Sequence, residues 1–123
     1  MDENGTFSIS DAPADGEATV VSVTGEVDMG TSPSFQRGLL QAIGAGRGGL
    51  IVDLSRASFI DSTALTQLVG AFDELRQRGG GTLAIVAADP RMRSLFEVAR
   101  LERDFEIYES RAEALSAVES AKR

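Results

Sequence analysis

An acid and two hydroxyl side chains stand side by side at Asp61, Ser62 and Thr63. An apolar pattern with helical spacing follows them, so we expect Asp61 to cap a helix that ends at about Arg78, with Ser62 at its first position. A serine there points outward beside backbone N–H groups, and a helix N-terminus accommodates the negative charge of a phosphate. The triplet therefore has two interpretations: a helix cap alone, or a phosphorylation site.

Most nucleophilic and metal chemistry is excluded by composition. The 123 residues contain neither cysteine nor histidine. Disulfides, thiol nucleophiles, Cys/His zinc sites and Ser–His pairs are therefore ruled out. Acid–base chemistry would fall to carboxylates, arginines or Tyr108. We expect a binding protein rather than an enzyme, with no cofactor and no catalytic or metal site.

The net charge and the hydropathy of the chain indicate which partners and which cellular location to expect. The formal net charge is -7, from 19 acidic and 12 basic residues. An acidic chain is repelled by phosphate backbones, so a direct nucleic-acid partner is not expected. No apolar run approaches the roughly 18–20 residues that cross a membrane, and the N-terminal stretch MDENGTFS lacks the basic and apolar parts of a signal peptide. We expect a cytoplasmic protein without a membrane partner.

Strand and helix patterns alternate along the chain after a first short strand, in the order β-β-α-β-α-β-α-β-α. This order predicts an α/β fold with a mostly parallel sheet of four to five strands and about four helices, within one domain over residues 1–123, of which 1–5 are frayed. A turn is expected at 11–16 and a polar loop at 25–30. The expected strands are 6–9, 18–24, 50–54, 82–87 and 105–108, and the helices lie between them, with caps at 31 or 32, 61, 89 and 110.

Two further motifs do not fit their context. The stretch GAGRGG at 44–49 matches G-x-G-x-x-G but follows a helix, whereas a dinucleotide site needs those glycines before one. Asp53, near the end of a strand, resembles the acceptor of a receiver domain, but no lysine lies near Tyr108 to complete that site. We interpret Asp53 as a carboxylate that stabilises a turn before Ser55.

Three long segments resemble the STAS domain family. The segment VVSVTGEVDMGTSPSF (20–35) is similar to the family pattern G-E-[LV]-D-x-x-[TS]-x-P, and GLIVDLSRASFIDSTAL (49–65) is similar to its VDLS…FIDSSGL segment. Residues 80–110 resemble the remainder, so the resemblance covers nearly the whole chain. It implies a STAS-like fold, and for an acidic chain of this size it points to the anti-sigma-factor antagonists.

This resemblance implies a phosphorylation switch. In that group the serine after the acid is phosphorylated by the partner anti-sigma factor, an ATP-dependent serine kinase of the GHKL type. The matching residue is Ser62, and the matching loop acids are Glu26 and Asp28. The unphosphorylated protein binds the anti-sigma factor and frees a sigma factor, so the resemblance implies activation of transcription, as in a stress response.

Two residues depart from the family pattern, because Thr63 and Ala64 stand where Ser and Gly are usual. Thr63 keeps a hydroxyl and is a rival acceptor, and Ala64 adds a methyl group where a partner backbone would approach. These departures leave room for a constitutive STAS adaptor in a lipid-transport or stress-signalling complex. A weak nucleotide-binding protein is a third alternative, which the lack of a phosphate loop disfavours. The expected partner-binding residues are Glu26, Asp28, Asp61, Ser62, Thr63 and Ala64.

Overall fold

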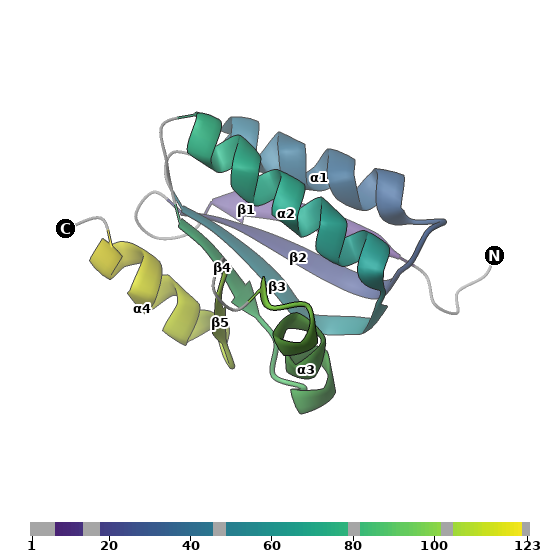
Figure 1. Cartoon of the computed structure of the whole chain (residues 1–123). Helices are drawn as coiled ribbons and strands as arrows, with labels where there is room; N and C mark the ends of the chain where they lie inside the picture. Colours follow the sequence, from purple (N-terminus) through teal and green to yellow (C-terminus); the bar gives the residue numbers. More distant parts are fainter. Residues whose placement is uncertain (1–6, 14–17, 46–48, 79–81, 102–104, 122–123) are drawn as a thin grey trace.

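The computed structural model describes residues 7–13, 18–45, 49–78, 82–101 and 105–121. Strands and helices follow the predicted order (Figure 1). Residues 1–5, expected to be frayed, lie outside the described part. The elements are β1 (Ser8–Pro13), β2 (Ala18–Val27), α1 (Ser32–Ala45), β3 (Gly49–Ile60), α2 (Ser62–Gln77), β4 (Thr82–Val86), α3 (Pro90–Val98), β5 (Glu106–Tyr108) and α4 (Arg111–Ala121).

The strands form one sheet in the order β1-β2-β3-β4-β5. Strands β2 to β5 are parallel to one another, and β1 joins the edge of β2 in antiparallel orientation. Each pair of parallel neighbours is connected through a helix, as parallel pairing requires. The predicted α/β fold with a mostly parallel sheet is therefore confirmed.

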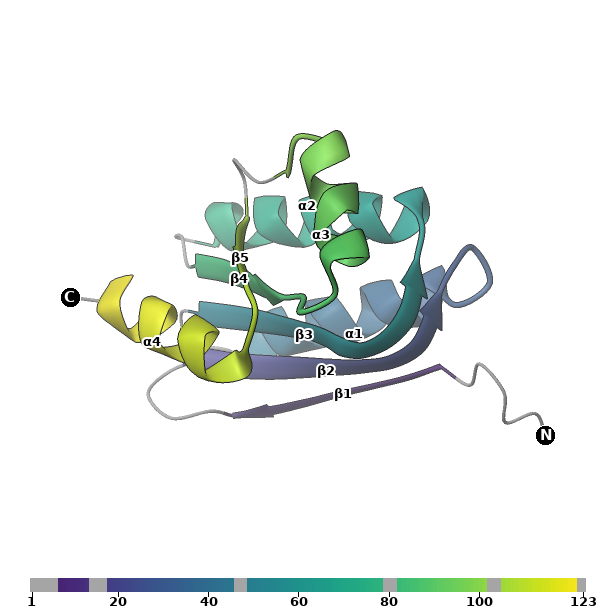
Figure 2. The same ribbon diagram turned by 90° about the horizontal axis from the view of Figure 1, so that it is seen from below.

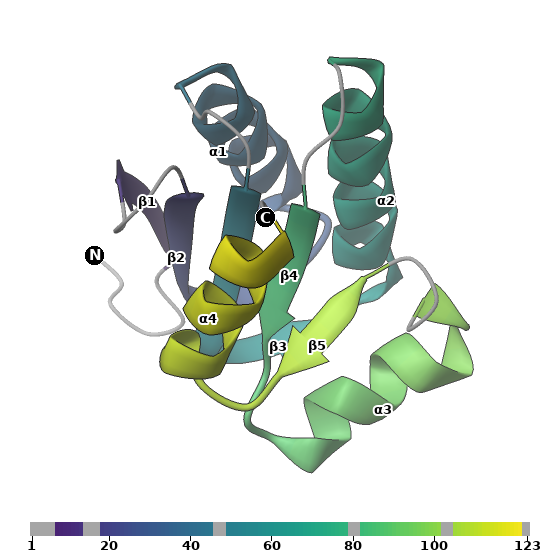
Figure 3. The ribbon, with the colours of Figure 1, turned by 90° about the vertical axis from the view of Figure 1, so that its left-hand side faces the viewer.

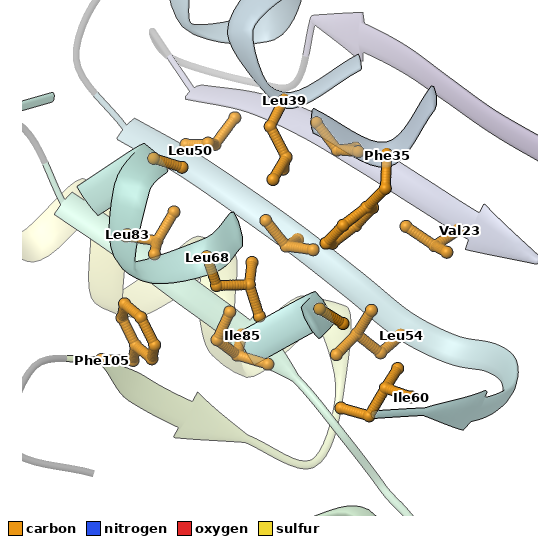
Figure 4. Packing of buried hydrophobic residues seen from close by; sticks show 14 of the residues in the cluster. Val23, Phe35, Leu39, Leu50, Leu54, Ile60, Leu68, Leu83, Ile85 and Phe105 are labelled. Carbon is orange, nitrogen blue, oxygen red and sulfur yellow. The ribbon is translucent and has the colours of Figure 1, made fainter. Parts of the chain in front are cut away.

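Helices lie on both faces of the sheet, in unequal numbers. Helices α1 and α2 lie side by side over one face, and α4 lies on the opposite face (Figures 1 and 3). The larger core is enclosed between the sheet and α1, α2 and α3, and Figure 4 shows its packing from close by. A smaller core beneath α4 contains Ala18, Val20, Ile51, Ala84, Val86, Ala114 and Val118. None of the described helices is long and apolar enough to span a membrane.

The first three strands extend further than the sequence predicts, whereas β4 and β5 are each one residue shorter than expected. Strand β1 continues to Pro13, where a turn was expected, and β2 continues to Val27, through half of the expected loop. Strand β3 runs on from Leu54 to Ile60, although residues 55, 56, 58 and 59 are exposed. Apolar patterning cannot reveal this polar extension, because it is held by backbone pairing with the end of β2.

Helix α2 fits its expected bounds and buries a face close to the expected one. Its N-cap is Asp61 and its C-cap is Arg78. The buried residues are Ala64, Leu68, Ala71 and Leu75, while Leu65, Val69 and Phe72 of the expected stripe are only partly buried. The buried stripe is thus rotated slightly toward the alanines, and Ser62 remains on the solvent side.

Candidate functional site

The N-terminus of α2 is closed by the carboxylate of Asp61. Its Oδ1 atom accepts hydrogen bonds from the backbone N–H of Thr63 at 2.9 Å and of Ala64 at 3.2 Å. The cap residue itself has extended backbone angles, with φ at -121° and ψ at -173°. This is the geometry of an N-cap, so the predicted capping role of Asp61 is confirmed.

Ser62 is exposed at the first position of the helix. No described residue accepts a hydrogen bond from its backbone N–H, whereas the next two N–H groups are occupied by Asp61. The hydroxyl of Thr66 donates to the carbonyl oxygen of Ser62 at 3.0 Å, one turn further on. Ser62 therefore presents its hydroxyl to solvent at the positive end of the helix dipole.

Thr63 and Ala64 lie deeper than Ser62. Thr63 is partly buried, so its hydroxyl is less accessible to a second protein than that of Ser62. Ala64 is fully buried, and its methyl group belongs to the core between α2 and the sheet. This differs from the expectation that Ala64 lies at the partner-binding surface: the residue fills the core, because this side of the first turn of α2 faces the sheet.

The two other expected site residues lie at the end of β2, which contains Glu26, and in the loop that follows it, which contains Asp28. The Oδ1 atom of Asp28 accepts hydrogen bonds from the N–H groups of Gly30 at 2.9 Å and Thr31 at 3.1 Å. The hydroxyl of Thr31 donates to the carbonyl oxygen of Glu26 at 2.9 Å. The Asp28 carboxylate thus stabilises this turn. Glu26 is exposed, and its side chain has no described hydrogen-bond partner.

The register of the sheet brings this loop to the start of α2. Val27 pairs with Ile60 at the carboxyl ends of β2 and β3. The backbone N–H of Asp61 then donates to the carbonyl oxygen of Val27 at 3.2 Å. The acids Glu26, Asp28 and Asp61 therefore lie at the same end of the sheet as Ser62, as expected. Among the described residues, no group of three or more acidic side chains has the geometry to hold a metal ion.

Exposed apolar side chains at this end of the sheet were not predicted. Met29 is 78% exposed and Phe59 is 48% exposed. Phe59 also lines a hollow of about 320 Å³ between the end of β3 and α3, together with Met92 and Leu95. Sequence patterning gives little signal for them, because single apolar residues on a surface are common.

A second polar cluster lies on the sheet face that carries α4. The carboxylate of Asp53 accepts a hydrogen bond from the N–H of Ser55 at 2.9 Å, as the turn interpretation predicts. It also accepts two from Arg111, from Nη2 at 2.8 Å and Nε at 3.0 Å. Burial alone would raise the pKa of Asp53, but the hydrogen bonds from Ser55 and Arg111 outweigh it and lower that pKa. An acid within an apolar strand signals a buried partner, but the sequence does not reveal Arg111, 58 residues away.

Comparison with known proteins gives the family. The STAS domain family matches residues 10–114. The chain is 36% identical over 87 residues to the anti-sigma-B factor antagonist of Listeria monocytogenes, a match that covers 69% of this chain and 74% of that protein. It is 28% identical to an anti-sigma factor antagonist from Mycobacterium paratuberculosis, whose crystal structure superposes with a TM-score of 0.85 over 97% of this chain and 99% of that one.

A more distant structure shares the fold. The Bacillus cell fate determinant SpoIIAA in its phosphorylated form is 22% identical and superposes with a TM-score of 0.68, over 90% of this chain and 99% of that one. The three segments that suggested the family from sequence, 20–35, 49–65 and 80–110, all lie within the matched residues. The chain belongs to the STAS domain family, within its group of anti-sigma-factor antagonists.

Proposed function

We propose that this protein is a phosphorylation-switched antagonist of an anti-sigma factor, with Ser62 as the phosphate acceptor. Unphosphorylated, it binds an anti-sigma factor that is an ATP-dependent serine kinase of the GHKL type, and a sigma factor is released to activate transcription. Phosphorylation of Ser62 ends that binding. The observation that carries the proposal is the exposed serine at the first position of α2, directly after its cap.

Two relationships support this proposal. The Listeria relative is an anti-sigma-B factor antagonist, and the Mycobacterium relative is an anti-sigma factor antagonist. In addition, SpoIIAA, which shares the fold, has been solved both unphosphorylated and phosphorylated. The fold is therefore compatible with a phosphorylated residue.

The chemistry at Ser62 requires only access and orientation from this chain. The kinase transfers the γ-phosphoryl group of ATP to the Ser62 hydroxyl oxygen, the hydroxyl proton is lost, and ADP leaves. The acceptor needs an exposed hydroxyl on a rigid element, and the cap bonds of Asp61 supply that rigidity. All acid–base and nucleotide contacts belong to the kinase.

Phosphorylation at this position is expected to leave the fold intact. A phosphoserine carries about -1.5 to -2 charges near pH 7. At the first position of α2 this charge lies beside the helix N-terminus and the backbone N–H of Ser62, from which no described residue accepts a hydrogen bond. Its electrostatic cost within the protein is thereby reduced, so the modification does not need to unfold the helix.

The effect falls instead on the partner interface. The phosphate adds to a surface that already carries Glu26, Asp28 and Asp61. A partner that docks over Ser62 would have to bury this charge without a matching cation, and an unpaired buried charge costs several kcal/mol. Binding is therefore lost while the fold is retained.

The acceptor is tested by incubation with candidate anti-sigma kinases and ATP, followed by intact-mass measurement. We expect wild type and Thr63→Ala to gain one phosphate and Ser62→Ala to gain none. Thr66→Ala is the matched control, since Thr66 is an exposed hydroxyl of the next turn. Phosphate uptake by Ser62→Ala but not by Thr63→Ala would assign the acceptor to Thr63. No uptake by wild type from any kinase would favour a constitutive STAS adaptor instead.

A further inference from the structure

The sheet face opposite α1 and α2 is apolar at one end and polar at the other. At one end its side chains form the small core beneath α4, with Val20 and Ile51 at its centre. At the other end the same rows of side chains become short and polar. They line an open hollow of about 570 Å³, whose short polar residues are Ser8, Ser10, Ser22, Thr24, Asp53 and Ser55, and which Arg56 and Arg111 also border.

The hydroxyl groups of this hollow form a grid that the strand register sets. Ser8 of β1 pairs with Thr24 of β2, and Ser10 pairs with Ser22. Ser22 in turn pairs with Asp53 of β3. Serine is not a favoured strand residue, and a solvent-facing sheet row more often carries long side chains that cover it. Here the short side chains leave the space that longer ones would fill.

A bulge in β3 brings a cation to the same place. Ser22 pairs with Asp53, whereas Thr24 pairs with Arg56, so β3 contains an extra residue between these two pairs. An extra residue of this kind re-aims the side chains beside it. As a result, Ser55 and Arg56, which are adjacent in sequence, both line the hollow.

The second arginine is fixed in position across the hollow. The guanidinium of Arg111 donates to the buried carboxylate of Asp53 and to the hydroxyl of Ser22, the latter at 3.0 Å. No described carboxylate lies within 4 Å of the guanidinium of Arg56. Among the described residues, the lining therefore has two cations and one anion, in a chain whose net charge is -7.

We propose that this hollow binds a small phosphorylated molecule that also carries hydroxyl groups. Arg56 would receive the phosphate, since a guanidinium matches phosphate oxygens with paired donors, and Arg111 would border it. The serine and threonine hydroxyls, which both donate and accept, suit the hydroxyls of the ligand. The site lies on the opposite face of the sheet from α2, so it is separate from the proposed phosphorylation surface.

The test is a two-dimensional amide NMR titration of the full chain with glucose 6-phosphate, glucose and inorganic phosphate as probes. We expect saturable shifts at Ser10, Ser22 and Ser55 with glucose 6-phosphate, weaker binding of inorganic phosphate, and none of glucose. Arg56→Ala should weaken glucose 6-phosphate binding by about tenfold or more. Arg91→Ala is the matched control and should bind like wild type, since Arg91 is an exposed arginine outside the hollow.

Three results would overturn the proposal: no saturable shift with glucose 6-phosphate, equal binding by Arg56→Ala and wild type, or inorganic phosphate binding as tightly as the sugar phosphate. A fourth would be shifts confined to the N-terminus of α2. Arg56 is exposed, so its variant should melt near wild type, and a thermal melt separates loss of binding from loss of folding.

Discussion

The backbone N–H of Asp61 donates a hydrogen bond to the carbonyl oxygen of Val27, 3.2 Å away. This bond ties the residue that caps α2 to the end of the strand that precedes Asp28. The start of α2 and the loop that contains Asp28 are therefore held together by backbone atoms. A substitution of Asp61 can remove the charge of this side chain without separating the two segments.

Substitutions of Asp61 separate capping from charge. Asn caps a helix about as well as Asp, so Asp61→Asn should unfold in urea close to wild type. Asp61→Ala loses the bonds to Thr63 and Ala64 and should lower the free energy of unfolding by about 1 kcal/mol. We expect Asp61→Asn to be phosphorylated more slowly than wild type. If it matches wild type in both urea melts and phosphorylation time courses, the carboxylate is only a cap.

The packing of α2 predicts an order of stability losses. Leu68 is fully buried, so Leu68→Ala should lower the free energy of unfolding by roughly 2–5 kcal/mol. Val69 is only partly buried, and Val69→Ala should cost about 1 kcal/mol. Gln67, which the helical pattern alone places at a neutral position, donates to Ser32 at 3.0 Å, and Gln67→Ala should cost about 1 kcal/mol. A urea series in which Gln67→Ala is the most damaging of the three is incompatible with this packing.

Two helical glycines should respond to alanine in opposite directions. A Cβ atom at Gly70 of α2 meets no other atom within 4 Å, so Gly70→Ala should raise the free energy of unfolding by about 0.5–1 kcal/mol. A Cβ atom at Gly38 of α1 would lie 2.5 Å from Cδ1 of Ile9. Gly38→Ala should therefore destabilise, by about 1–3 kcal/mol, because the side chain of Ile9 has to move from its position against α1. Stabilisation by Gly38→Ala would show that α1 and β1 are less closely packed.

The single tyrosine allows a direct test of electrostatics at the end of β5. Burial, together with the hydrogen bond from its hydroxyl to Glu106 at 2.6 Å, raises the pKa of Tyr108 to about 12. In the unfolded chain the value is about 10, so this group's contribution to stability is present below pH 10 and is lost as the pH rises toward 12. An ultraviolet titration of the phenol in the folded chain should show the high midpoint. Glu106→Gln should lower it, and Glu97→Gln, an exposed acid on α3, should not. A midpoint of about 10 in the folded wild type contradicts the contact.

The regular part of the fold could be predicted from sequence because it follows local rules. Asp61 and Asp89 stand at helix starts and do cap α2 and α3, with Pro90 in the first turn of α3. The hydroxyl oxygen of Ser110 accepts a hydrogen bond from the N–H of Glu113 at 3.2 Å, as a capping box requires. The carboxylate of Glu113, however, accepts from the N–H of Glu109 rather than from the N–H of Ser110. Local sequence patterns thus predict the cap residues, whereas the hydrogen bond that the Glu113 carboxylate accepts depends on the path of the chain into α4.

The features that the sequence did not reveal depend on pairing between distant segments. The polar end of β3 is a strand only because β2 continues beside it, and Asp53 meets Arg111 only because α4 returns to the sheet. Ala64 looked like a surface residue because the family pattern has Gly at this position in the partner-facing segment, but the approach of α2 to the sheet buries it. Such outcomes require the tertiary arrangement, which no window of the sequence contains.

The most direct test of the switch is the affinity of the anti-sigma kinase for this protein before and after phosphorylation. Calorimetric titration should compare wild type, wild type phosphorylated on Ser62, and Ser62→Ala, with thermal melts of all three. We predict that the phosphorylated protein binds at least about tenfold more weakly, that Ser62→Ala binds like unmodified wild type, and that all three melt at similar temperatures. Equal affinity of the phosphorylated and unmodified proteins for the kinase would contradict the proposed switch.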